Sequence, residues 1–101
     1  MSAYVVMIRE QVTDTAELDA YARLAPAARA GHTITPLAFY GSVDVLEGDP
    51  VAGVVIHQFE SMAAARAWYD SPAYQAALEH RLRGARYRVL IVDGVAPAAG
   101  A

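Results

Sequence analysis

The residue in this sequence best suited to proton transfer is a histidine within an apolar segment. His57 lies in the run Val54-Val55-Ile56-His57-Gln58-Phe59, which has the composition of a buried strand. An imidazole titrates near neutral pH and can take up or release a proton. A buried histidine can also be structural, bonded to the backbone or packed at a subunit interface. The sequence leaves both roles open for His57.

Aromatic residues form a second group of candidates. Tyr40 stands next to Gly41 and could donate a proton or orient a ligand, and the alternative is a half-buried aromatic in a strand. Trp68, Tyr69 and Tyr74 lie near the junction of two expected helices, where aromatic residues usually belong to the core. Any of them can serve as a pocket wall if the core encloses a ligand.

The remaining histidines and one carboxylate are weaker candidates. His32 follows a glycine in an expected loop, and His80 stands between charged neighbours and is expected to be solvated. The chain has no cysteine and no HxH or HExxH spacing, so no metal site is expected. Asp70 precedes Ser71-Pro72 and should stabilise that turn and the next helix N-terminus, with a carboxylate base as the alternative.

Four arginines cluster near the end of the chain: Arg81, Arg83, Arg86 and Arg88. They could bind a carboxylate or phosphate, but the first two lie near an expected helix C-terminus, where the helix dipole favours cations. A solvated face is the simpler interpretation. No glycine-rich phosphate loop, Rossmann fingerprint or Ser-His-Asp arrangement is present. We therefore expect no nucleotide, flavin or other cofactor.

The composition indicates one small globular domain. The 101 residues are 55% hydrophobic and 19% charged, with a net charge of −3. There is no basic stripe for nucleic acid, no apolar run long enough to span a membrane and no signal-peptide pattern, so a cytoplasmic location is expected. So apolar a composition in a short chain favours an additional buried surface, such as a homodimer interface.

Periodicity and capping residues predict the elements that position these side chains. Strands are expected at 4–8, at 34–46 with an interruption at Gly41-Ser42, at 54–59 and at 87–92. Helices are expected to begin at the caps Asp14, Ser61 and Ser71, and Pro26 should end the first helix near Leu24. Strand 4–8 is apolar throughout, which indicates burial on both faces. Tyr74, Leu78 and Leu82 should form the apolar stripe of the last helix, and Glu47-Gly48-Asp49-Pro50 a turn.

The order strand, helix, strand, strand, helix, strand is that of a ferredoxin-like βαββαβ sandwich, an α+β fold with an antiparallel sheet and helices on one face. Such helices leave the other face of the sheet bare, and a second copy of the sheet is the simplest cover. We expect one domain over residues 1–95 and a flexible tail at 96–101.

Several segments resemble a known family. They are Val45-Leu46-Glu47-Gly48-Asp49, Val54-Val55-Ile56, the stretch from Ala63 to Gln75 with its Trp-Tyr-Asp-Ser-Pro-x-Tyr-Gln motif, and Leu90-Ile91-Val92-Asp93-Gly94-Val95. Together they are similar to the bacterial proteins grouped as domain-of-unknown-function 1330. The resemblance implies the dimeric α+β barrel superfamily, which includes cofactor-free monooxygenases, polyketide cyclases, isomerase- and dehalogenase-like enzymes, haem-binding members and stress proteins.

The resemblance also suggests which residues line a pocket between sheet and helices. The sequence reads Phe39-Tyr40-Gly41-Ser42 where the family usually has an arginine before a glycine pair, and His57-Gln58 where it usually has a glutamate before the phenylalanine. These departures imply a more neutral, aromatic pocket. Its expected ligand-binding residues are Phe39, Trp68, Tyr69, Tyr74, Asp70 and Arg81, with Arg81 as an anion anchor because an arginine in this helix resembles the family's pattern.

Two functions are therefore expected. The first is a cofactor-independent enzyme of cyclase, isomerase or monooxygenase type, with His57 as acid/base and Tyr40 as proton donor or oxyanion partner. Its substrate would be a largely apolar, aromatic or polyketide-type metabolite. The alternative is a non-catalytic ligand-binding or stress-related dimer in which His57 is structural.

Overall fold

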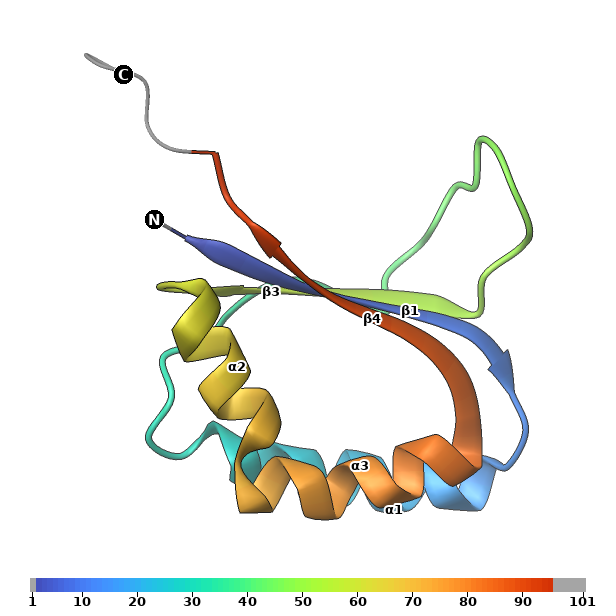
Figure 1. Ribbon diagram of the computed structural model, residues 1–101. Helices are drawn as coiled ribbons and strands as arrows, with labels where there is room; N and C mark the ends of the chain where they lie inside the picture. The colour runs from blue at the N-terminus through green and yellow to red at the C-terminus, as the bar shows by residue number, and fades with distance from the viewer. Residues whose placement is uncertain (1, 96–101) are drawn as a thin grey trace.

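The computed structural model describes residues 2–95, and the expected tail at 96–101 lies outside the described residues. The elements are β1 (Ala3–Val12), α1 (Thr15–Leu24), the 3₁₀ helix η1 (Ala25–Arg29), β2 (Thr35–Phe39), β3 (Gly53–Phe59), α2 (Met62–Asp70), α3 (Pro72–Gly84) and β4 (Ala85–Asp93). Their order confirms the predicted βαββαβ arrangement (Figure 1).

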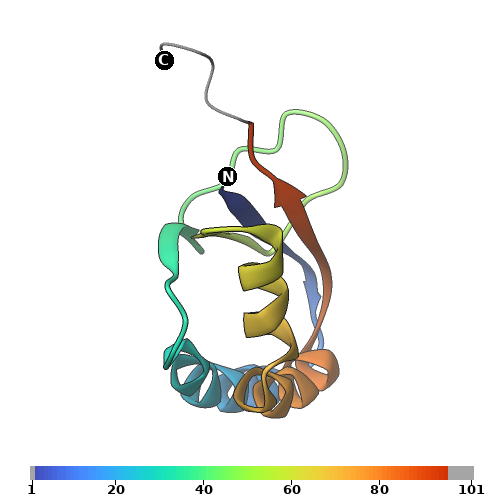
Figure 2. The same cartoon turned by 60° about the vertical axis from the view of Figure 1, so that its left-hand side comes forward.

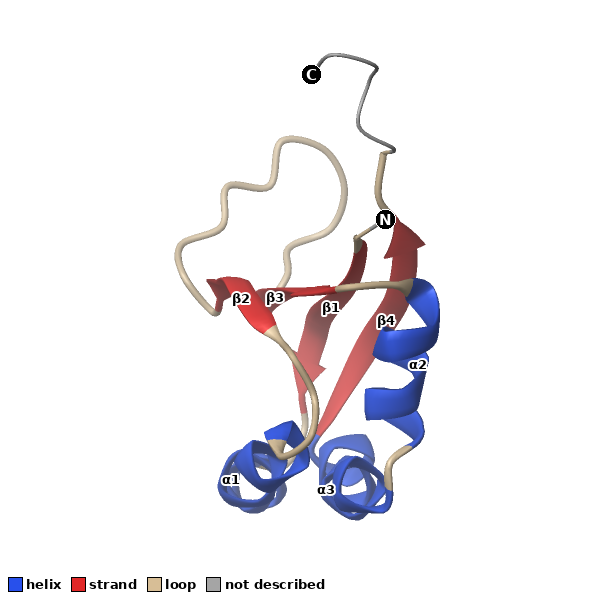
Figure 3. Cartoon of the chain, turned by 90° about the vertical axis from the view of Figure 1, so that its left-hand side faces the viewer, coloured by secondary structure: helices blue, strands red, loops and turns tan. Residues whose placement is uncertain are grey.

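The four strands form one antiparallel sheet in the order β2-β3-β1-β4. All the helices lie on one side of this sheet, with α1 and α3 side by side (Figure 3). Helix α2 runs from the sheet down to the layer of α1 and α3, so it closes one side of the space between them (Figure 2). This is the α+β, ferredoxin-like architecture that the sequence predicts.

The helices begin where the capping residues place them. Asp14 accepts hydrogen bonds from the backbone N–H groups of Ala16 and Glu17, and Ser61 and Ser71 cap α2 and α3. Helix α1 ends at Leu24 and gives way to η1, as predicted from Pro26. The carboxylate of Glu17 binds His80 and Arg83 instead of closing a capping box, so it ties α1 to α3.

The core lies between the sheet and the helices. Alternate residues of β1 and β3 face it, including Val5, Met7, Val55 and Phe59, and they pack against Trp68, Tyr74 and Leu78 from the helices. The neighbouring residues of β1 are half-buried in the single chain, so burial of this strand on both faces stays a prediction that depends on a second copy of the chain. They point to the outer face, which no helix covers.

Two further expectations need correction. The extended segment at 34–46 is a strand only up to Phe39, because Tyr40 has a positive φ of 53° that turns the chain out of the sheet. In α3, Leu82 is 67% exposed, and Arg81 takes the buried position beside Ala77 and Leu78.

The outer face of the sheet is apolar. Val6 and Ile8 of β1 lie in register with Ile56 and Val54 of β3, and Leu90 of β4 is the other neighbour of Val6. The loop 40–52 rises on this side, away from the helices (Figure 1). Within residues 2–95, none of the helices has the length and apolar character needed to cross a bilayer.

Candidate active site

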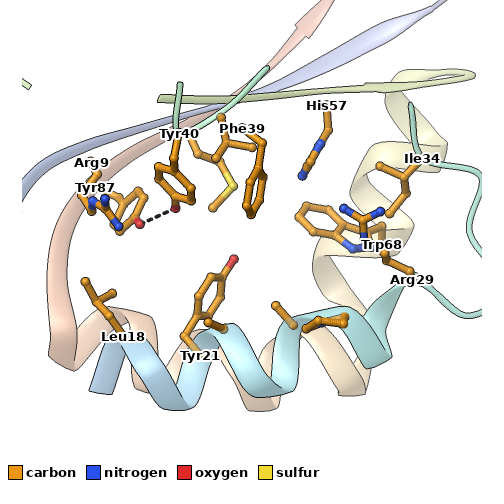
Figure 4. A pocket seen from close by; sticks show the side chains of 15 residues that line it. Arg9, Leu18, Tyr21, Arg29, Ile34, Phe39, Tyr40, His57, Trp68 and Tyr87 are labelled. Carbon is orange, nitrogen blue, oxygen red and sulfur yellow. Dashed lines mark hydrogen bonds between the residues drawn. The ribbon is translucent and has the colours of Figure 1, made fainter. Parts of the chain in front are cut away.

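A cavity of about 160 Å³ lies between the inner face of the sheet and the helices. Strands, helices α1 and α2, and η1 all contribute to its wall (Figure 4). It is lined by Met7, Arg9, Leu18, Tyr21, Ala22, Ala25, Pro26, Arg29, Ile34, Phe39, Tyr40, Val55, His57, Trp68 and Tyr87. The wall is mostly apolar and aromatic with a few polar groups, which is the usual make-up of a small-molecule site.

His57 projects from β3 into this cavity. Strand alternation places it on the same face as Val55 and Phe59, and its side chain is only 6% exposed. Its ring stacks on Phe39 at 6.2 Å between centroids and meets the edge of Trp68 at 6.4 Å. The Nδ1 atom is buried and has no hydrogen-bond partner among the described residues. Burial, and then the positive charge of Arg29, lower the pKa of His57, so the ring is neutral at pH 7.

Tyr40 is held at the opposite end of the cavity. Its hydroxyl oxygen lies 2.6 Å from that of Tyr87, and the Arg9 guanidinium lies 4.3 Å from the centre of its ring. A positive φ costs a non-glycine residue about 1–2 kcal/mol, and Tyr40 adopts one here. Burial, followed by the bond to Tyr87, raises the pKa of Tyr40, so its hydroxyl keeps its proton.

A second tyrosine pair lies beneath the first. The hydroxyl oxygens of Tyr21 and Tyr74 are 2.9 Å apart, and burial raises the pKa of both groups. Tyr21 lines the cavity, whereas Tyr74 is fully buried behind it. The Arg81 guanidinium lies against one ring of each pair, 4.6 Å from the centre of the Tyr87 ring and 5.9 Å from the centre of the Tyr21 ring. It is 2% exposed, so the expectation that it belongs to a solvated face was wrong.

The cavity is more positively charged than the sequence indicated. Arg9 and Arg29 line it, and none of the described residues in its wall is acidic. The prediction of a more neutral, aromatic pocket did not take Arg9 or Arg29 into account. Arg9 continues the inward alternation of Val5 and Met7 along β1, so strand periodicity could have identified it; no comparable pattern marks Arg29.

The predicted site residues divide into two groups. His57, Tyr40, Phe39 and Trp68 meet at the cavity. Tyr69 instead borders a shallow groove with Met62 and Val89, and Tyr74 and Arg81 lie in the core behind the wall.

The other charged candidates lie outside the cavity wall. Asp70 forms an exposed ion pair with Arg66 at 2.9 Å. His80 Nδ1 is 2.8 Å from the Glu17 carboxylate, so His80 is not simply solvated. Throughout residues 2–95, no three histidine, aspartate or glutamate side chains converge as metal ligands would.

Gly53 sets the position of Tyr40, and its replacement tests this. A Cβ at position 53 would lie 2.6 Å from Cδ1 of Tyr40 and 3.2 Å from Nη2 of Arg9. We expect Gly53→Ala to displace the tyrosine ring and to lower the free energy of unfolding by about 1–3 kcal/mol, measured by urea denaturation. Gly41→Ala is the matched control, since nothing lies within 4 Å of its Cβ. Equal midpoints for the two variants would contradict this role of Gly53.

Comparison with known proteins places this chain in a family. Residues 2–95 match the family model described as Domain of unknown function (DUF1330). The chain belongs to the DUF1330 family. No curated protein matches this DUF1330 chain in sequence.

Solved structures resemble the DUF1330 chain in fold at low sequence identity. A protein of unknown function from Rhodopseudomonas palustris is 17% identical, with a TM-score of 0.70 over 95% of this chain and 84% of that one. A dimeric ferredoxin-like protein of unknown function from Thermobifida fusca is 14% identical, with a TM-score of 0.62 over 92% and 91%. SnoaB, a cofactor-independent oxygenase from Streptomyces nogalater, is 13% identical, with a TM-score of 0.62 over 95% of each chain.

Proposed function

We propose that this DUF1330 protein is a cofactor-independent enzyme that moves a proton on a small, largely apolar ring compound. His57 is the acid/base, and Tyr40 is the hydrogen-bond donor to the oxygen that gains charge. Cyclisation, isomerisation and oxygenation all begin with such a proton transfer. The similarity to SnoaB, an oxygenase without a cofactor, supports the idea that this fold can hold such chemistry.

The observation that carries the proposal is the state of His57. It is neutral at pH 7, it faces the cavity, and its Nδ1 makes no hydrogen bond within residues 2–95. A neutral imidazole can accept a proton, whereas a charged one cannot. The resulting imidazolium would lie beside the Trp68 ring.

The chemistry can be tested without knowledge of the natural substrate. 2-Cyclohexen-1-one is a single ring that contains a conjugated enone, and its C–H bonds at C4, one carbon beyond the C=C bond, lose a proton slowly in water. His57 would take that proton, and the electron pair would move through the conjugated system to the carbonyl oxygen near Tyr40. Return of a deuteron in D₂O restores the ring and labels it. We expect the protein to accelerate this labelling, as followed by NMR; no acceleration over buffer would contradict the enzymatic proposal.

A homodimer belongs to the same proposal. The outer face of the sheet carries exposed or half-buried apolar residues from three strands, and single domains rarely leave so continuous an apolar surface in water. The related structure from Thermobifida fusca is described as dimeric. A second copy, packed sheet to sheet, would cover Val6, Ile56 and Leu90.

Light scattering tests this pairing. The wild-type protein in solution should have the mass of two chains at low micromolar concentration. Val6→Lys should shift it to one chain, because a lysine at the centre of the interface would be buried without a partner. Ala76→Lys, on the exposed side of α3, should leave the dimer intact. A wild-type protein with the mass of one chain would overturn the dimer.

A second candidate function is favoured by one feature of His57. A catalytic base is commonly oriented by a third group, and His57 has no such partner among residues 2–95. The chain would then be a non-catalytic ligand-binding protein in which the same cavity holds a small ring compound. Ligand binding without proton exchange is the result that this function predicts.

A further inference from the structure

The end of the cavity opposite His57 concentrates positive charge that nothing in the described structure neutralises. Arg9 lies on the face of Tyr40, and Arg81 lies on the face of Tyr87. Neither arginine forms an ion pair with any acidic residue in the described part of the chain. The Nε atoms of both are buried and lack a hydrogen-bond partner there.

Arg81 is buried, whereas Arg9 is half-buried and donates one hydrogen bond from Nη2 to the carbonyl of Ala52. A guanidinium group held partly or wholly out of water without an opposite charge is costly for a protein. A cation over an aromatic ring is attracted by the π-electrons, but this recovers only part of what its solvation would provide. An anion bound close by would supply the missing charge. The fold therefore favours a negatively charged occupant at this end of the cavity.

The two hydroxyl groups between these arginines are suited to hold that anion. Tyr40 and Tyr87 both line the cavity, and their oxygens are 2.6 Å apart. One of the two hydroxyl hydrogens is used within the pair, so the other can be donated to a ligand oxygen. The neighbouring arginines draw electron density from the rings, which makes each hydroxyl a stronger donor to an oxyanion. Figure 4 shows the pair at one end of the cavity and His57 at the other, with Phe39 between them.

The size of the cavity limits the ligand. Its volume of about 160 Å³ is close to the roughly 150 Å³ of an apolar protein cavity that holds benzene. One six-membered ring fits within it, and a fused polycyclic compound would have to extend beyond the wall. The aromatic lining of Phe39 and Trp68 matches the faces of such a ring.

We propose that Tyr40 and Tyr87, with Arg9 and Arg81 against their rings, form an oxyanion site that binds single-ring phenols or enols as their anions. This rests on the proposed function for the location of the site, and it defines the class of substrate. The oxygen of the ligand would face the tyrosine pair, and the opposite edge of its ring would face His57.

The titratable and charged groups in the cavity wall all act on such a ligand. They are Arg9, Tyr21, Arg29, Tyr40, His57 and Tyr87. The pKa of His57 is lowered and those of Tyr21 and Tyr40 are raised, chiefly by burial, so these three groups are neutral at pH 7 and the arginines supply positive charge. Their field favours ionisation of a bound phenol.

4-Nitrophenol tests the assignment, because its anion is yellow and its neutral form is not. Its titration in the presence of excess protein should be shifted to lower pH than in buffer. The anion should also bind about ten- to a hundredfold more tightly than nitrobenzene, a neutral ring of similar shape. An unshifted or upward-shifted titration, or no binding of nitrophenol, would overturn the oxyanion site.

Variants locate the effect. Tyr87→Phe removes the hydroxyl that is hydrogen-bonded to Tyr40 and should weaken the preference for nitrophenolate while leaving nitrobenzene binding unchanged, which would show that the cavity remains folded. Tyr69→Phe, outside the cavity wall, is the control and should behave as wild type. A Tyr87→Phe variant that keeps the full preference would contradict the site. His57→Gln should retain the downward shift of the nitrophenol titration, because the ligand oxygen would lie at the other end of the cavity, so failure of proton exchange and failure of the oxyanion site can be told apart.

Discussion

Replacing Trp68 by alanine should lower the free energy of unfolding by about 3–5 kcal/mol, as for other large aromatic truncations in cores. The indole is 5% exposed and packs on Tyr74 at 4.2 Å and on Phe59 at 5.3 Å between ring centres. Through these two contacts it joins α2 to β3 and to α3. Removing the indole would leave an empty space that is continuous with the existing cavity. The neighbouring aromatic rings could not move to fill this space and the cavity together.

Urea denaturation provides the measurement. The midpoint should fall while the slope with denaturant concentration stays the same, since the folded state keeps its extent of burial. Leu82→Ala is the matched control, because that side chain is exposed and its loss should cost less than 1 kcal/mol. An unchanged midpoint for Trp68→Ala would show that the indole does not contribute to the core.

His57→Gln should reduce the proton exchange of 2-cyclohexen-1-one by about 10²- to 10⁴-fold, the usual contribution of a positioned proton-transfer group. Glutamine keeps a polar side chain of similar reach but cannot take up a proton at neutral pH. Stability at pH 7 should change little, because Nδ1 of His57 gives up no hydrogen bond to any of residues 2–95. His32→Gln, in the loop before β2, is the control and should exchange at the wild-type rate.

The pH dependence of stability, measured for the wild type and for His57→Gln, distinguishes a catalytic histidine from a structural one. Since the pKa of His57 is lowered on folding, the unfolded chain binds the proton more readily. The wild-type protein should therefore lose stability as the pH falls through about 6.5 towards the lowered pKa, and His57→Gln should reduce that slope. A variant that unfolds readily at pH 7 but retains the exchange activity of its folded fraction would assign His57 a structural role.

Much of the fold could be predicted from the sequence because its signals are local. Asp14, Ser61 and Ser71 cap the helices that follow them, and Pro26 ends α1, each through contacts within a few residues. The end of β2 could not be predicted in this way. It depends on the left-handed backbone of Tyr40, which is tolerated because Gly53 on the neighbouring strand leaves room for the ring.

The candidate site was only half predictable for a related reason. His57 is conspicuous because it interrupts an apolar strand, and Tyr40 because it borders a glycine. Tyr87 reaches the cavity through the pairing of β4 with β1, where it is the direct partner of Arg9, and Arg9 lies beyond the strand predicted at 4–8. Arg81 was expected to be solvated because it lies near a helix C-terminus, where cations are favoured, yet the turn of α3 directs it towards the tyrosines.

The pH titration of the His57 ring by NMR shows whether a neutral imidazole faces a ligand cavity in this protein. We expect a midpoint below about 6.5, the ordinary pKa of histidine, and a change in the ring's chemical shift when 2-cyclohexen-1-one binds. A midpoint at or above 6.5, or a ring that neither titrates before the protein unfolds nor responds to the ligand, would contradict this expectation.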